Sequence, residues 1–294
     1  MKKEINLSII IISYNTWKLT DQCLSSIFMS LAGTLISYEV IVVDNASQDR
    51  SGELIKKHYP TVRLLDNYEN VGYGKGNNQG IQAARGAVVL LLNSDILVLD
   101  QAVEKLYQFF ITLPAKSITG GKLFNLDYSP QDSCGPGYTL PVIFAALFLK
   151  GDHLHVTRYS PDKVRSVDWV MGACIMARRV DFGAIGGFDE NIFMYMEEID
   201  WQYRAKRLGY RIVFYPHAHF IHKGAGSSSG HRTPILNVFQ GLKYFYKKHY
   251  NLAENIILRV LLVYKSLLAI GLFTILNRKN DQKLYFTALK MALS

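Results

Sequence analysis

Short apolar runs alternate with segments of helical spacing along the first part of the chain. The runs are largely apolar, which is typical of strands buried on both faces of a parallel sheet. We predict strands at 7–12, 40–43, 62–65 and 87–92, and helices at 16–30, 49–58, 79–85 and 101–110. Strands that alternate with helices form βαβ units. The pattern therefore predicts an α/β fold with a mostly parallel sheet flanked by helices.

The pattern changes after residue 115. Turn-forming residues without a clear period fill 120–137, and a flexible Ser/Gly stretch is expected at 227–230. Between them we expect a strand at 167–177, a loop at 181–195, a helix at 196–208 and a strand at 211–215. From residue 235 onward the spacing is helical. We predict one large domain over 1–230, with halves 1–115 and 116–230, followed by a helical tail over 231–294.

The net charge of +9, from 33 basic and 24 acidic residues, is concentrated in the tail. Nine Lys or Arg residues and two acidic residues lie in 235–294, which gives +7. The charge therefore lies on an apolar helical segment and not on a polar groove, which argues against nucleic-acid binding. An amphipathic helix on an anionic membrane surface fits this pattern, with Arg259 and Lys265 arguing against a spanning helix. Packing on the main domain and a homodimer interface remain alternatives.

The three cysteines are Cys23, Cys134 and Cys174, and no two of them form a C-x-x-C pair. This spacing argues against a disulfide framework or a zinc–thiolate site and favours a reducing, cytoplasmic compartment. The first apolar run follows two lysines but has no small-residue cleavage site after it. We therefore interpret it as a first strand and not as a signal peptide.

Asp95 directly follows the predicted strand 87–92 and the residues Asn93 and Ser94. Because an unpaired carboxylate is costly in an apolar core, Asp95 should emerge at the carboxyl end of the strand, where ligands of open α/β sheets bind. A carboxylate there can hold Mg²⁺ or Mn²⁺, and the ion can hold a diphosphate. The alternative is that Asp95 caps the following turn.

Three further polar clusters follow predicted strands and could converge on the same edge. They are 13–15 (SYN), 44–45 (DN) and, after a loop, 197–200 (EEID). Together with further motifs, they give the chain a specific resemblance. It resembles a family 2 inverting glycosyltransferase with a GT-A fold, in the rhamnosyltransferase-like branch. The matching segments occur in the expected order: SIIIISYN (8–15), EVIVVDNAS (39–47), ENVGYGKGNNQG (69–80), LNSD (92–95), WVMGA (169–173), GFDE (187–190), FMYMEEID (193–200) and IH (221–222).

The resemblance implies a donor site for a sugar nucleotide. Asp44 would accept a hydrogen bond from the ring N–H of a pyrimidine base, although an N-cap or Asx turn before Ser47 explains it too. The glycines near 72–80 do not follow a G-x-G-x-x-G pattern after the first strand, so a dinucleotide site is not favoured. Turns and caps would also explain this stretch. The residues assigned to nucleotide or sugar binding are Ser13, Tyr14, Asn15, Asp44, Asn45, Asn70, Gly72, Asn77, Asn78, Asn93, Ser94, Gly172 and Ala173.

The resemblance also implies a divalent metal, Mg²⁺ or Mn²⁺, held by Asp95 and His222. Asn93 stands where the family has the first aspartate of its Asp-x-Asp motif, which implies looser metal binding supported by the diphosphate. The run H-x-H-x-x-H (217–222) suggests zinc, but the chain supplies no closed four-ligand set. We assign structural roles to His217 and His219.

The resemblance places the catalytic base at Glu198, where the family has an aspartate. Glu197 is the second candidate. Asp200 and Arg204 are one helical turn apart and should form an ion pair. The alternative is that the three acids only favour a solvated helix N-terminus. Trp169 could stack on an acceptor ring or belong to the core.

The implied reaction moves a sugar from dTDP-rhamnose or a UDP-sugar to a hydroxyl of a cell-surface polysaccharide or lipid-linked glycan. The enzyme would be cytoplasmic and peripheral at the inner face of the cell membrane. A sugar nucleotidyltransferase is an alternative, but residues 14–16 (YNT) lack its Gly-rich, basic loop. A catalytically inactive glycan- or membrane-binding module is another, because Glu198 departs from the family pattern.

Overall fold

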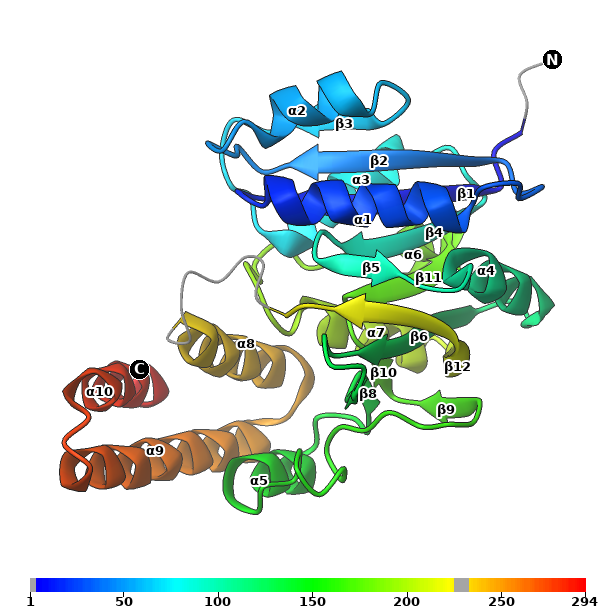
Figure 1. The fold of residues 1–294 in the computed structure, drawn as a ribbon. Helices are drawn as coiled ribbons and strands as arrows, with labels where there is room; N and C mark the ends of the chain where they lie inside the picture. Colours follow the sequence, from blue (N-terminus) through cyan, green and yellow to red (C-terminus); the bar gives the residue numbers. More distant parts are fainter. Residues whose placement is uncertain (1–3, 225–232) are drawn as a thin grey trace.

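The centre of the molecule is a mixed sheet, whose strands lie one below another in Figure 1. The computed structural model describes residues 4–224 and 233–294. Within these residues the sheet has ten strands, and its main path runs β3-β2-β1-β4-β11-β6-β12-β5. Strand β7 pairs with β6, and β9 pairs with β12. The predicted flexible stretch 227–230 lies outside the described residues.

The first four strands are parallel, as predicted. They are β1 (Leu7–Ser13), β2 (Tyr38–Asp44), β3 (Arg63–Asp66) and β4 (Val88–Asn93). Ser13 pairs with Asp44, and Ile12 pairs with Asn93. The polar residues that end these strands therefore lie at one edge of the sheet.

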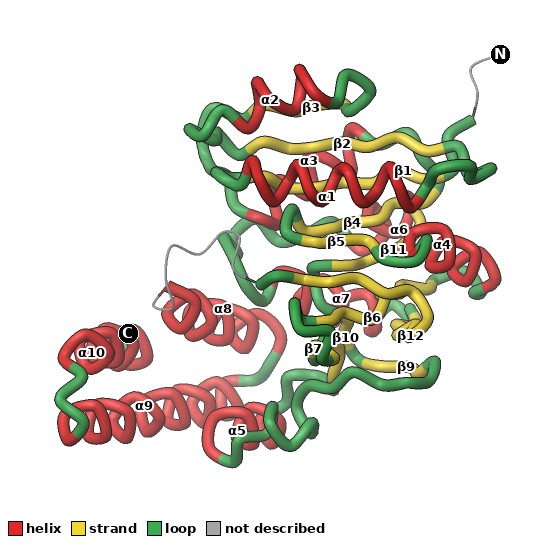
Figure 2. Tube along the Cα trace, viewed as in Figure 1, coloured by secondary structure: helices red, strands yellow, loops and turns green. Residues whose placement is uncertain are grey.

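Helices cover both faces of the sheet (Figure 2). On one face, α1 (Trp17–Ser30) and α4 (Ala102–Thr112) contribute to an apolar core with the side chains of Ile9, Ile11 and Leu90, and α2 (Ser51–His58) lies beside α1. On the other face, three helices pack on Ile10, Val43 and Leu91. These helices are α3 (Tyr73–Ala83), α6 (Arg179–Ile185) and α7 (Glu197–Arg207). The alternation of β-strand side chains divides the apolar runs between these two cores.

Helix α3 begins earlier than the sequence pattern indicated, because the glycines of 72–80 lie largely inside it. A Cβ atom at Gly80 would lie 2.4 Å from Ile10 Cγ2, and one at Gly76 would lie 3.3 Å from Ile12 Cδ1. The glycines therefore allow close packing of the helix on β1. Glycine weakens isolated helices, so the sequence of this segment carries only a weak helical signal.

The second half contains more regular structure than expected. The segment without a clear period holds β6 (Ser117–Phe124), β7 (Pro130–Gln131) and β8 (Cys134–Gly135), and the expected loop 181–195 contains most of α6. β6 was not predicted because it contains Gly120 and Gly121, and glycine is uncommon in strands. Gly121 allows close packing, since a Cβ there would lie 2.5 Å from Phe220 Cε2. The other elements are β5 (Ile96–Val98), α5 (Leu140–Phe148), β9 (Arg165–Val167), β10 (Trp169–Val170), β11 (Cys174–Arg178) and β12 (Arg211–His222).

The tail is helical, as predicted, and forms α8 (Thr233–His249), α9 (Leu252–Ile275) and α10 (Lys279–Leu293). Side chains of α8 share a third apolar core with Trp169, Met196 and Ile199 of the main body. Helix α9 packs against α5, α8 and α10. The first tail helix therefore lies against the segment that carries the two candidate catalytic glutamates.

Candidate active site

The ends of β1 and β2 form a braced loop pair. The Asn15 backbone N–H donates to Ser47 Oγ at 2.8 Å, and Gln48 N–H donates to Asn15 Oδ1 at 2.6 Å. Ser13 is fully buried, and its hydroxyl contacts those of Thr16 and Thr20. Ser13 therefore lies beneath the loop, whereas Tyr14 is exposed beside it.

Asp44 lies at the wall of a cavity of about 450 Å³ that also includes Asp66 and Asn67. Both oxygens of the carboxylate bind Ser47: the backbone N–H donates at 3.0 Å and the hydroxyl at 2.5 Å. A local contact between Asp44 and Ser47, of the kind considered as an alternative, is therefore present. Burial raises the pKa of Asp44, and the neighbouring charges of Asp66 and Asp49 add to this against the hydrogen bonds from Ser47.

A network of asparagines fixes the loop that precedes α3. Asn45 Nδ2 donates to Asn70 Oδ1 at 3.3 Å and to the Gly72 carbonyl at 3.2 Å. Asn77 Nδ2 donates to the Tyr73 carbonyl, and Asn78 makes three bonds to the 188–190 turn. These contacts use the amide groups of Asn77 and Asn78 within the protein, and they link α3 to the turn before α7.

Asp95 and His222 lie together across the sheet edge, with 3.4 Å between Asp95 Oδ1 and His222 Nε2. His222 Nδ1 donates to Gln131 Oε1 at 2.7 Å, so the other ring nitrogen, Nε2, faces Asn93 and Asp95. Gln131 is itself held by Asn125, whose Oδ1 accepts from Gln131 Nε2 at 3.0 Å. Burial would raise the pKa of Asp95, but the hydrogen bond and charge of His222 outweigh it and lower the pKa.

Asn93 contacts both His222 and the segment Gly172–Ala173. Its backbone N–H donates to the Ala173 carbonyl at 3.2 Å. Among the described residues, its buried Oδ1 atom has no hydrogen-bond partner. The neighbouring Gly172 faces Glu198: a Cβ at Gly172 would lie 3.6 Å from both Glu198 Cβ and Cγ. The Gly172–Ala173 segment therefore lies between Asn93 and Glu198.

Glu197 and Glu198 begin α7 after a strained turn. Tyr195 and Met196 adopt positive φ angles of 67° and 78°, a costly conformation for residues with side chains. In the described part of the chain, the buried Oε2 atom of each glutamate has no hydrogen-bond partner. Burial raises the pKa of both glutamates, and the charge of Glu198 raises that of Glu197 further. Both carboxyls therefore hold protons more tightly than an exposed glutamate does.

The predicted ion pair between Asp200 and Arg204 is confirmed, at 2.8 Å. Asp200 is fully buried and also accepts from Lys248 Nζ at 2.9 Å and from His249 Nε2 at 2.6 Å. The carboxylate therefore joins α7 to α8. His217 is exposed, and the ring of His219 packs edge-on against Phe124. This arrangement agrees with the structural role assigned to His219.

Comparison with known proteins identifies the family. The model of the family described as glycosyl transferase family 2 matches residues 8–129. A rhamnosyltransferase of Escherichia coli K12, WbbL, is 30% identical over 211 residues, which cover 63% of this chain and 72% of WbbL. The chain belongs to glycosyltransferase family 2.

One further related sequence and one related structure are similar to this glycosyltransferase. An N-acetylglucosaminyl-diphospho-decaprenol L-rhamnosyltransferase of Mycobacterium tuberculosis is 28% identical over 248 residues, which cover 76% of this chain and 77% of that one. The mannosyltransferase PcManGT of Pyrobaculum calidifontis, solved with GDP-Man and Mn²⁺, has a TM-score of 0.58 at 16% identity, covering 99% of this chain and 76% of that one. The predicted GT-A-like fold and rhamnosyltransferase-like relationship are confirmed.

Sequence reasoning missed three residues around the site of this glycosyltransferase. Gln131 orients His222, and Tyr73 donates to the Gly172 carbonyl at 2.6 Å. The half-buried Arg158 partly offsets the effect of burial on the pKa of Glu198. Gln131 and Arg158 lie in segments with no clear period, where the sequence carried no signal for either residue.

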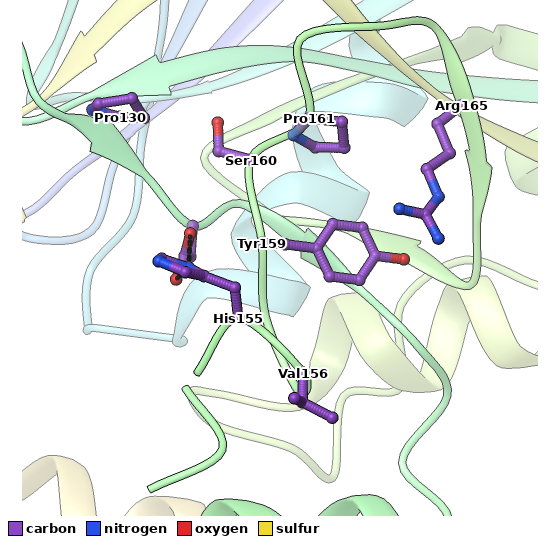
Figure 3. Close-up of a pocket in the computed structure, with 8 residues that line it drawn as sticks. Pro130, His155, Val156, Tyr159, Ser160, Pro161 and Arg165 are labelled. Carbon is purple, nitrogen blue, oxygen red and sulfur yellow. Dashed lines mark hydrogen bonds and ion pairs between the residues drawn. The ribbon is translucent and has the colours of Figure 1, made fainter. Parts of the chain in front are cut away.

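A second cavity, of about 630 Å³, lies beside β7 (Figure 3). Its lining includes Asp132, which forms an ion pair with His155 at 2.9 Å, and Arg165, whose guanidinium lies 4.8 Å from the centre of the Tyr159 ring. Asp132 immediately follows Gln131. One residue of the cavity lining, Asp132, is therefore the sequence neighbour of the residue that binds His222.

Proposed function

We propose that this enzyme transfers a sugar from a pyrimidine nucleotide diphospho-sugar, dTDP-rhamnose or a UDP-sugar, to a hydroxyl of a lipid-linked or cell-surface glycan. One observation carries the proposal. Asn93, which contacts His222 beside Asp95, and Glu198 lie on either side of the same short segment, Gly172–Ala173. A leaving-group site and a base site on either side of one short segment suit a single displacement.

The base of the nucleotide would occupy the cavity at Asp44. A raised pKa does not prevent binding there, because a carboxylate accepts from an imide N–H and a carboxyl group can donate to a ring carbonyl. The asparagine network around Asn45 and Asn70 would fix the loop that borders the ribose. Tyr14 is exposed, and the next residue, Asn15, donates its backbone N–H to Ser47 at the wall of this cavity, so we expect the Tyr14 ring to cover the base.

The donor set fits a divalent cation. Asp95 offers a carboxylate and His222 offers Nε2, because Gln131 takes the proton-bearing Nδ1. Among residues 4–224 and 233–294, no group of three or more His, Cys, Asp or Glu could hold an ion alone, which agrees with a cation shared with the diphosphate. When bound, Mg²⁺ or Mn²⁺ would act as a Lewis acid that stabilises the departing diphosphate. The unpartnered Asn93 Oδ1 would accept from a donor-sugar hydroxyl.

Glu198 would act as the general base. It would take the proton of the acceptor hydroxyl as that oxygen attacks the anomeric carbon, and the bond to the diphosphate breaks on the opposite face. The new bond therefore has inverted configuration. A raised carboxyl pKa suits this role, because a base is most effective when its pKa approaches the working pH. Glu197 is the second candidate, and the more deeply buried one.

The acceptor would be lipid-linked and the enzyme peripheral at the inner face of the membrane. Helix α9 is long and apolar enough to cross a membrane, with a mean hydropathy of 2.1, and little of it is buried. One side of α9 is exposed and apolar along its length: Ile256, Val260, Tyr264, Leu267, Leu268 and Ile275. Its other side packs in the tail core through Leu258 and Leu262, so we favour a helix lying on the bilayer over one that crosses it. A homodimer through this side is the competing arrangement.

The test is release of nucleoside diphosphate from a panel of sugar nucleotides, with Mn²⁺ or with EDTA. We expect one donor to be consumed in a metal-dependent manner and both Asp95→Ala and His222→Ala to lose this release. Thermal shift with each nucleotide checks that the variants fold. Release of pyrophosphate from a nucleoside triphosphate would instead indicate a nucleotidyltransferase. If no donor is turned over with any lipid-linked acceptor, the proposal is wrong.

A further inference from the structure

Tyr73 is the first residue of α3, and its side chain extends to the turn 171–173 between β10 and β11. Its hydroxyl donates to the Gly172 carbonyl at 2.6 Å. Its backbone N–H donates to the Phe193 carbonyl, in the loop before α7, at 3.2 Å. Tyr73 therefore joins α3 to two segments that are far away in the sequence.

Both of these segments contact the two candidate catalytic glutamates. A Cβ at Gly172 would lie 3.6 Å from Tyr73 Cε1 and 3.6 Å from both Glu198 Cβ and Cγ. The backbone of Gly172, the Tyr73 ring and the Glu198 side chain therefore meet at one point. A Cβ at Gly74, one residue after Tyr73, would lie 3.6 Å from Glu197 Cβ. The first turn of α3 thus packs against the first turn of α7.

The Gly172 carbonyl is held differently from its neighbours. Backbone N–H groups donate to the carbonyls of Met171 and Ala173, at 3.1 and 3.2 Å. The Gly172 carbonyl accepts from a side chain, the Tyr73 hydroxyl. Glycine has more backbone freedom than any other residue, and it has no side chain that packing could hold. The orientation of the Gly172 peptide therefore depends on this hydroxyl.

The charges around the site keep the hydroxyl in its donating form. Burial raises the pKa of Tyr73 well above its usual value, and the charges of Glu197 and Glu198 raise it further. Burial also raises the pKa of Glu198, whereas hydrogen bonding to backbone N–H groups, that of Gly172 among them, acts against it. The other titratable groups that interact with Glu198 are Glu197, Tyr138, Arg158 and Tyr195.

We propose that Tyr73 is a positioning residue for the catalytic base: its hydroxyl fixes the Gly172 peptide, and this peptide fixes the carboxyl group of Glu198. The inference rests on the proposed function, in which Glu198 is the base. The role belongs to the hydroxyl and not to the ring. A phenylalanine at this position would fill the same space and leave the Gly172 carbonyl without its donor.

The test compares Tyr73→Phe with wild type in the metal-dependent release of nucleoside diphosphate, using the sugar nucleotide that the wild type consumes. We expect kcat to fall about tenfold or more, because a displaced base is less effective, while the KM for the donor stays unchanged. The pH at which kcat/KM reaches half of its maximum should rise, because the carboxylate loses an N–H that favours its charged form.

Tyr246→Phe is the matched control. Tyr246 is fully buried, and its hydroxyl donates to a backbone carbonyl, that of Tyr138, at 2.7 Å. Both variants remove the same kind of hydrogen bond, so their losses of thermal stability should be similar. Tyr246→Phe should leave kcat and the pH profile unchanged. Equal losses of kcat in the two variants, or a wild-type pH profile in Tyr73→Phe, would overturn the inference.

A double variant separates positioning from a general structural effect. Tyr73→Phe should lower kcat no further in Glu198→Gln, because the base that it positions is already absent. Additive losses would contradict this. Full turnover in Glu198→Gln, or an inactive wild type, would overturn the base assignment and this inference together. Lost turnover in Glu198→Gln with unchanged turnover in Tyr73→Phe would overturn this inference alone.

Discussion

Replacing Asp200 should show how much more a buried ion pair than a surface one contributes to the stability of this enzyme. Its carboxylate is fully buried and accepts from Arg204, Lys248 and His249 at 2.6–2.9 Å. In Asp200→Asn the amide NH₂ would face these donors, so at least one buried N–H loses its acceptor. Removing one partner of a buried ion pair costs about 3–5 kcal/mol. We expect about 3 kcal/mol, because Arg204 and Lys248 are 19% and 29% exposed and can regain water.

The assay is urea unfolding of wild type and Asp200→Asn, with Asp281→Asn as the control. Asp281 pairs with Arg278 at the surface, where such a pair contributes about 0–1 kcal/mol. Equal losses of unfolding free energy in the two variants, or a loss below about 1 kcal/mol in Asp200→Asn, would refute the reasoning.

The same carboxylate predicts a dependence on pH. Burial alone would raise the pKa of Asp200, but the hydrogen bonds from His249 and Lys248 and the charge of Arg204 outweigh it and lower the pKa. Stability from a lowered pKa is complete above the unfolded value of about 4 and is lost as pH falls through the folded value. The difference between wild type and Asp200→Asn should therefore be constant near neutrality and shrink below about pH 4.

Three further predictions concern the site and the packing. Glu198→Gln should lower kcat by at least about 100-fold, and Glu197→Gln should lower it by much less. The wild-type kcat/KM should rise with pH, because the raised pKa of Glu198 keeps the base protonated in acid. A larger loss of kcat in Glu197→Gln would reassign the base. Gln131→Leu should weaken Mn²⁺ binding about 10–100-fold in equilibrium dialysis with saturating UDP or dTDP, whereas Gln131→Glu should retain it; equal affinities would exclude an orienting role. Gly80→Ala should cost about 1–3 kcal/mol in urea unfolding, because its Cβ would lie 2.4 Å from Ile10 Cγ2, whereas Gly183→Ala meets nothing within 4 Å and should not destabilise.

The sequence pattern predicted the parallel half of the fold well because β1, β2 and β4 are almost entirely apolar. It failed at β6 and at the start of α3 for a shared reason. In both places glycine serves close approach between elements, and this depends on neighbours such as Phe220 and Ile10 that lie far away in the sequence. A local pattern does not contain that information.

Some residues of the candidate site could be predicted from the sequence, and others could be found only from the structure. Asp95, His222, Glu197 and Glu198 could be selected because they belong to recognisable motifs. Gln131 and Tyr73 act through partners that only the fold brings near, namely His222 and Gly172. Asn77 and Asn78 were also selected from a motif; their amides donate to the protein, and their contact with the donor stays a prediction.

The left-handed turn at Tyr195 and Met196 has a consequence for how this enzyme unfolds. A Cβ at Gly241 of α8 would lie 2.8 Å from Met196 Cγ and 3.0 Å from the Tyr195 carbonyl, so α8 lies directly on the turn. The energy that holds these residues in a rare conformation thus comes partly from the tail. A fragment ending at residue 230 would lose this support and expose Met196 and Ile199 to water. The tail and the catalytic helix should therefore melt in a single cooperative transition, and the shortened fragment should be inactive as well as insoluble.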